Sequence, residues 1–192
     1  MQDSKSMTGR LSRRGFIGAM GATTALAACG NGVGSQGGAS LDNRVDSTRN
    51  FLFSRYPGTQ ELEAKSHGVL WMPLITKAGL WVGGAYGRGA LRINNVTVDY
   101  YSATKASFGF QVGAQQYAHA LFFMTPDALR IFRSGPGWSA GADLEYAFLN
   151  DAGAVSASTL TSLDPVIALV FGQQGLIVGA SLEGTKYTRI IP

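Results

Sequence analysis

The only cysteine of the 192-residue chain, Cys29, stands where its sulfur could be modified covalently. It follows Leu26-Ala27-Ala28, a run similar to the bacterial lipobox, where a signal peptidase cuts before the cysteine. In that chemistry the sulfur takes a diacylglyceryl group through a thioether, and the new amino terminus takes an acyl chain. A single cysteine also excludes an internal disulfide and a cysteine-rich metal site. We therefore predict lipid attachment at Cys29.

Arg13 and Arg14 predict export of the chain. They lie in Ser12-Arg13-Arg14-Gly15-Phe16-Ile17, which matches the twin-arginine signal. The apolar run that follows would reach only about 20 Å as a helix, short of a hydrocarbon core of roughly 30 Å. We expect a signal peptide over residues 1–28, then the lipidated cysteine and a flexible glycine-rich tether over residues 29–40. The alternative is an ordinary secretory signal with a chance cysteine.

Residues suited to acid, base or metal chemistry are few, and His67 and His119 are the only histidines. A Ser-His-Asp set could be assembled from Ser107, His119 and Asp127, but no nucleophile elbow surrounds the serine. The acidic residues show no metal-binding spacing. Residues 83–89 resemble a phosphate loop only loosely, because the Gly-Lys-Ser/Thr ending is missing. We expect a protein that is not an enzyme and that uses no metal and no cofactor.

Basic residues and amphipathic aromatic residues are the remaining candidates for a binding surface. Together they suit a lipid-headgroup interface, and here they are Trp71, Trp81, Trp138, Lys77, Arg88, Arg92, Lys186 and Arg189. The alternative is that the tryptophans are core and the basic residues form a solvated face. Nucleic acid is not an expected partner. Of the net charge of +4, the 12 basic and 11 acidic residues outside the signal peptide account for only +1.

Two helices are predicted before the first strand. The apolar residues of Leu41–Tyr56 fall on one helical face, and Pro57-Gly58 ends that pattern. A shorter helix is predicted over Thr59–Lys65. The apolar stripe of the first helix is flanked by Arg44, Arg49 and Arg55. This pattern is typical of a membrane-surface helix, but also of an ordinary helix packed on a sheet.

Eight to nine strands and one further helix are predicted after residue 67. A strand from Gly68 ends at Pro73, and a hairpin turns about Asn94-Asn95. Pro126 starts a short helix. Trp138–Leu149 is expected to form one strand, and the last hairpin is expected to pair Val166–Phe171 with Leu176–Glu183.

Glycines recur four residues apart at Gly79/Gly83, Gly109/Gly113, Gly137/Gly141 and Gly175/Gly179. Residues four apart in a strand share a face, so the pattern predicts four bent strands with small-residue notches. Such notches could open a groove beside Trp81 and Tyr86. The predicted fold class for residues 41–192 is α+β. It is β-rich, with a strongly curved antiparallel sheet or partly closed barrel and short N-terminal helices.

Five motifs follow one another between His67 and the C-terminus, at residues 68–73, 77–89, 98–102, 108–115 and 182–186. In these motifs the chain resembles the SYLF domain family, bacterial lipoprotein branch. The resemblance implies lipid binding, because eukaryotic relatives bind phosphoinositides through basic residues and an amphipathic N-terminal segment. Some relatives act on actin, a role that is not carried over to an exported bacterial lipoprotein. The resemblance points to Lys77, Arg88 and Lys186 as phosphate contacts, with Trp81 and Tyr86 beside them.

These observations together predict an exported lipoprotein whose domain binds anionic phospholipid or phosphoinositide headgroups at a membrane surface. The alternative is a protein-interaction or envelope-maintenance module, with a protein partner in the envelope and a lipid anchor that merely positions it. Gly30, rather than aspartate, follows the cysteine, which favours the outer membrane in a two-membrane cell. We therefore expect a lipid-anchored protein of the cell envelope, on the periplasmic face of the outer membrane.

Overall fold

The computed structural model describes residues 36–79, 82–108, 114–141, 145–149, 164–172 and 182–192. All of them belong to one compact unit that spans Gly32–Pro192. Of the candidate site residues named above, Arg13, Arg14, Cys29 and Trp81 lie outside the described residues.

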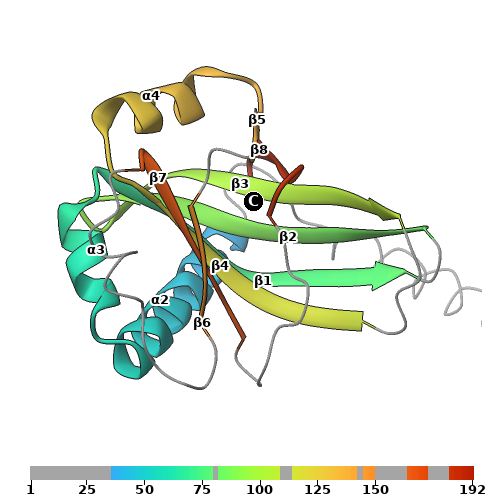
Figure 1. The fold of residues 1–192 in the computed structure, drawn as a ribbon, viewed down its shortest axis with the longest axis horizontal. Coiled ribbons are helices and arrows are strands. Elements are labelled where there is room, and N and C mark those ends of the chain that lie inside the picture. The colour runs from blue at the N-terminus through green and yellow to red at the C-terminus, as the bar shows by residue number, and fades with distance from the viewer. Residues whose placement is uncertain (1–35, 80–81, 109–113, 142–144, 150–163, 173–181) are drawn as a thin grey trace, which may run out of the picture. The chain divides into compact units, whose positions relative to one another are not determined.

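The described helices are close to those expected (Figure 1). α2 spans Gly37–Arg55, so it begins earlier than expected, within the residues predicted to form the tether, and α3 spans Thr59–Lys65. α4 spans Pro126–Ser134, with proline in its first turn. The hydroxyl of Thr125 caps α4 by accepting a hydrogen bond from the Ala128 N–H at 3.2 Å.

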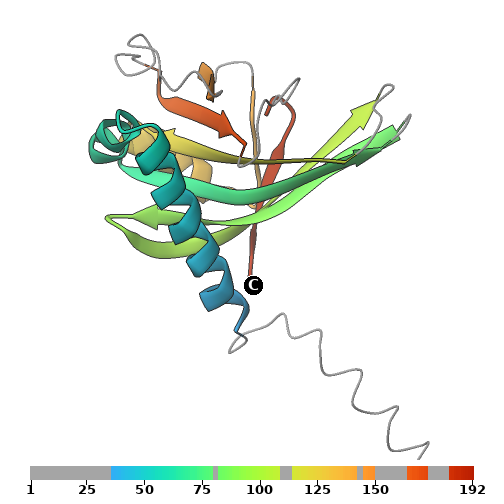
Figure 2. The ribbon, with the colours of Figure 1, turned by 90° about the horizontal axis from the view of Figure 1, so that it is seen from below.

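In the part of the chain that the structure describes, eight strands form one sheet in the order β5-β8-β3-β2-β1-β4-β7-β6. Neighbouring strands are antiparallel except β6 and β7, which run parallel. Figures 1 and 2 show the sheet curving, so the α+β prediction with a strongly curved sheet is confirmed. The strands are β1 (Gly68–Gly79), β2 (Val82–Ile93), β3 (Val96–Phe108), β4 (Ala114–Phe123), β5 (Trp138–Ser139), β6 (Glu145–Leu149), β7 (Val166–Phe171) and β8 (Lys186–Ile190).

Two strand predictions are wrong. β1 does not end at Pro73, because a bulge between Trp71 and Leu74 absorbs the proline and the strand continues to Gly79. The expected strand Trp138–Leu149 is two strands, β5 and β6, at opposite edges of the sheet. The expected partner of β7, Leu176–Glu183, lies mostly outside the described residues.

The two faces of the sheet pack against different helices. On the α2 face, Val45 and Leu52 pack with Trp71, Phe122 and other buried residues. On the α4 face, Phe132 packs with residues that include Tyr101 and Tyr187. Figure 2 shows α2 crossing one face of the curved sheet. Its apolar stripe is therefore buried against the strands, as in an ordinary packed helix.

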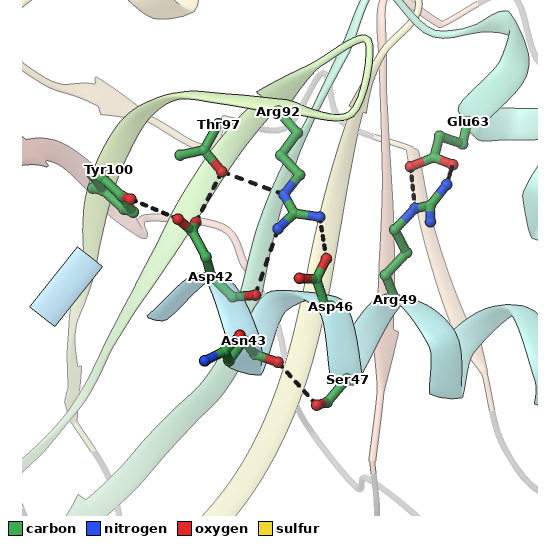
Figure 3. A network of polar contacts seen from close by, with 9 residues as sticks. All are labelled: Asp42, Asn43, Asp46, Ser47, Arg49, Glu63, Arg92, Thr97 and Tyr100. Atoms are coloured by element: carbon green, nitrogen blue, oxygen red, sulfur yellow. Dashed lines mark hydrogen bonds and ion pairs between the residues drawn. The ribbon is translucent and has the colours of Figure 1, made fainter. Parts of the chain in front are cut away.

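A polar network also fastens α2 to the β2–β3 hairpin (Figure 3). The carboxylate of Asp42 accepts hydrogen bonds from Thr97 and Tyr100, both at 2.8 Å, and Arg92 pairs with Asp46. Arg49 forms a two-point ion pair with Glu63 of α3, at 2.8 and 2.6 Å. Burial, together with the Asp42 carboxylate, raises the pKa of Tyr100 to about 12. α2 thus covers this end of the sheet and is held to the β2–β3 hairpin by polar contacts.

Candidate functional site

Cross-strand register places three of the predicted binding residues on one face of the sheet. Arg88 pairs with Leu74 of β1 and Ser102 of β3. In the next row, Tyr86 pairs with Thr104, which pairs in turn with Lys186 of β8. Directly opposed residues of antiparallel strands project to the same face, so Tyr86, Arg88 and Lys186 lie together on the α2 face. Tyr86 and Lys186 are two strand spacings apart, about 10 Å.

This part of the α2 face lies beyond α2 and is open to solvent. We call it the basic–aromatic patch, made of Leu74, Val82, Tyr86, Arg88 and Lys186. Tyr86 is 54% exposed, Val82 70% and Leu74 38%, Lys186 is exposed, and Arg88 is half-buried. Figures 1 and 2 show β1, β2 and β3 extending past the helices at this end. Among the described residues, the cross-strand rows that contain the patch residues include two basic residues, Arg88 and Lys186, and no acidic residue.

Lys77 was predicted to join these residues, but it projects to the opposite face. It pairs with Ala85, which pairs with Lys105, so the two lysines share a row on the α4 face. Successive side chains of a strand point to opposite faces of the sheet. Lys77 is one residue away from Thr76, the partner of Tyr86, so the two side chains lie on opposite faces. Burial, and then the charge of Lys77, lowers the pKa of Lys105. Lys77 therefore belongs to a different surface.

The groove predicted beside Trp81 falls partly outside the described residues, and the described glycine pairs do not form notches four residues apart in one strand. Gly79 and Gly83 are not four apart in one strand but face each other across the β1–β2 pair. Gly137 and Gly141 flank the two-residue β5, and the pairs at 109/113 and 175/179 lie outside the described residues. At Gly89 a Cβ would lie 2.0 Å from the carbonyl oxygen of Trp71. Gly87 and Gly89 thus allow the backbone of β1 at its bulge to approach β2 closely, and that backbone fills the space where their side chains would lie.

The two other tryptophans serve the core. Trp71 is fully buried on the α2 face, where it packs edge-on against Phe53 and Phe122. Trp138 packs against Phe132 and Tyr187 on the α4 face. For Trp71 and Trp138 the structure therefore agrees with the alternative that the tryptophans belong to the core.

The hypothetical Ser-His-Asp set is not assembled. His119 is fully buried, and its Nε2 atom lies 2.8 Å from the hydroxyl of Tyr187. Burial lowers the pKa of His119 to about 3, so the ring is neutral at ordinary pH. Asp127 is exposed and pairs with Arg130. Ser107 is on β3, which β1 and β2 separate from the strand of His119.

Within the described ranges, no group of histidine, cysteine and acidic side chains could hold a metal ion. No helix among the residues described is long and apolar enough to cross a bilayer. A cleft of about 500 Å³ lies between α2, α3 and the turn at Asn94. Its Arg49 and Arg92 are already paired with Glu63 and Asp46, so it offers little charge to a ligand.

Comparison with protein-family models matches residues 104–189 to the family described as Ysc84, Las17-binding protein actin regulator. The match runs from the middle of β3 to β8, so it includes Lys186 and Thr104, the β3 partner of Tyr86, but not Tyr86 or Arg88 themselves. This match supports the SYLF domain family for that part of the chain. The SYLF family is associated with binding to lipids and proteins. A search of the curated proteins returned no match.

Proposed function

We propose that this SYLF domain binds anionic phospholipid headgroups, phosphoinositides among them, through the basic–aromatic patch. The observation that carries the proposal is the grouping of Tyr86, Arg88 and Lys186 on one uncovered face, beside the exposed Leu74 and Val82. A tyrosine with an apolar body and a polar tip suits the headgroup layer, and each nearby basic residue adds about 1 kcal/mol of attraction to an anionic surface. The near-neutral domain charge is no obstacle, because the excess is local.

Flotation with liposomes tests this proposal on residues 32–192, which lack the acyl chains. Binding should rise with the fraction of anionic lipid and weaken as salt screens the surface. Lys186→Glu should reduce binding several-fold, because it replaces attraction by repulsion at the patch. Lys77→Glu is the matched control, since it makes the same charge change on the opposite face and should leave binding near normal.

Two results would contradict lipid binding by the patch. One is a domain that fails to float at any lipid composition in low salt, and the other is equal loss in the two variants. The second candidate is an envelope protein partner, which the exposed apolar residues and the family description, with its named protein partner, also favour. Pull-down from detergent-solubilised envelope would support that candidate if a stoichiometric protein survives washing.

We further propose that the SYLF domain acts as a binding module rather than an enzyme, without a metal or cofactor. His119 supports this, because its Nε2 atom is occupied by Tyr187 in the core. A residue in that position cannot exchange protons with a substrate in solvent. Hydrolysis of phospholipid by the purified domain would overturn this part of the proposal.

We infer from the sequence that the domain is exported and anchored by Cys29 in the cell envelope, on the periplasmic face of the outer membrane. Cys29→Ser should leave an unprocessed precursor without acyl chains, because the sulfur is the acceptor of the diacylglyceryl group. The check is gel mobility and membrane partitioning of the variant in cells. Protein of mature size that still partitions with membranes would contradict anchoring at this residue, and Ser35→Ala in the tether is a suitable control.

A further inference from the structure

A cleft of about 490 Å³ on the α4 side is lined by basic residues that the patch does not use. Its walls include Arg130, Arg133, Arg189 and His67, with Pro126 and Leu129 as the apolar part. The α4 residues recur at positions 126, 129–130 and 133, which is one face of a helix. Phe132 fixes the other face, because it is buried with its ring 4.7 Å from those of Tyr101 and Phe123.

One carboxylate holds two of the arginines side by side. Asp99 Oδ2 accepts a hydrogen bond from Arg133 Nε at 3.1 Å, and its Oδ1 pairs with Arg189 Nε at 3.2 Å. Arg189 is steadied further by donating from a terminal nitrogen to the carbonyl oxygen of Arg133 at 3.0 Å. The side chain of Asp99 is only 15% exposed, so it holds the guanidinium groups of Arg133 and Arg189 in fixed positions.

The cleft keeps both positive charge and unused donors. Three guanidinium groups face two carboxylates, those of Asp99 and Asp127, which leaves one excess positive charge. A guanidinium has five N–H donors in a rigid fork. Of the residues that the structure describes, none accepts a hydrogen bond from the terminal nitrogens of Arg133. A second anion could therefore bind where Asp99 does not reach.

We propose that this cleft is a binding site for a phosphomonoester. A tetrahedral, doubly charged group can accept paired N–H bonds from two or three guanidinium groups at once, which a carboxylate cannot do as fully. Leu129 and Pro126 would contact the organic part of the ligand. The site is distinct from the basic–aromatic patch, which is on the α2 face, so one flat bilayer cannot cover both. The ligand is accordingly a free phosphomonoester rather than a lipid headgroup.

Titration calorimetry on the full chain in detergent tests the site with glycerol 3-phosphate and inorganic phosphate. Arg130→Gln should weaken binding of glycerol 3-phosphate about tenfold, the effect of losing one charge-assisted contact. Arg130 does not touch Asp99, and its partner Asp127 is exposed, so this variant leaves the packed part of the site intact. Lys186→Gln removes the same charge from the other face and should leave the affinity unchanged.

The Arg133→Lys variant separates geometry from charge, because lysine keeps the charge but loses the paired donors. It should bind glycerol 3-phosphate several-fold more weakly and still unfold cooperatively. A second experiment offers the same phosphomonoester group on a lipid, in vesicles of phosphatidylcholine with phosphatidic acid. Vesicle binding that needs Arg130 but not Lys186, without binding of glycerol 3-phosphate, would overturn the assignment to a free ligand. No binding of either source at about 10 mM phosphate group, or equal affinity in Arg130→Gln and Lys186→Gln, would overturn the site itself.

Discussion

Replacing Gly89 by alanine should destabilise the domain by about 3 kcal/mol, a large part of the stability of a domain this size. The added Cβ would lie 2.0 Å from the carbonyl oxygen of Trp71 and 2.3 Å from the sulfur of Met72. The oxygen belongs to the backbone of β1 at its bulge, so it can move only if the central strand pair shifts. Denaturant unfolding of residues 32–192 measures the change as a lower midpoint with a similar slope.

Gly84→Ala is the matched control for this substitution, in the same strand. Its Cβ would come no closer than 3.2 Å to another residue, the carbonyl oxygen of Lys105. We expect a change of less than about 1 kcal/mol, since the mild crowding is offset by the reduced freedom of the unfolded chain. If Gly89→Ala were as stable as Gly84→Ala, the close approach of the β1 bulge to β2 would be wrong.

The buried His119 should make the domain less stable in mild acid. Burial holds its pKa at about 3 in the folded state, against an ordinary value of 6.5 in the unfolded chain. Below pH 6.5 the unfolded state therefore binds a proton that the folded state does not. The free energy of unfolding should fall by about 1.4 kcal/mol per pH unit as pH decreases from 6.5 toward 3, and this contribution is fully present above pH 6.5.

Comparison with His119→Gln isolates this contribution. Glutamine does not titrate and can still hydrogen-bond to Tyr187, while the other titrating groups act alike in both proteins. Denaturant unfolding of both proteins at several pH values between 4 and 7.5 gives the two slopes. The native protein should lose stability more steeply below pH 6.5, whatever their difference at pH 7.5. Parallel curves of stability against pH would show that the ring of the folded protein is protonated over the same pH range as that of the unfolded chain.

Local sequence signals predicted the elements that local chemistry determines. Asn94 and Asn95 both adopt positive φ, 50° and 64°, at the turn that joins β2 to β3, as the hairpin prediction required. Pro126 starts α4, and the apolar stripe from Leu41 marks α2. The bulge beside Pro73 could not be read in the same way, because proline in a strand equally indicates its end.

The candidate site was predictable in type but not in arrangement. Tyr86, Arg88 and Lys186 do share a face, whereas Lys77 lies on the other. The face of a residue depends on strand register, and that register follows pairings between segments as distant as Thr104 and Lys186. The spacing of Arg130 and Arg133 on α4 was visible in the sequence, but Asp99, the partner of Arg133, comes from β3 and Arg189 from β8.

The position of β8 bears on how fast the protein can finish folding. β8 follows the other described strands in the sequence, yet it is not at an edge of the sheet but between β3 and the short β5. It also supplies Tyr187, which closes the core over His119. Pairing of β1 to β4 can form the central strands, but the α4 face stays open until β8 pairs with β3. Completion of the fold therefore depends on a contact between segments far apart in the sequence, which should make it slow.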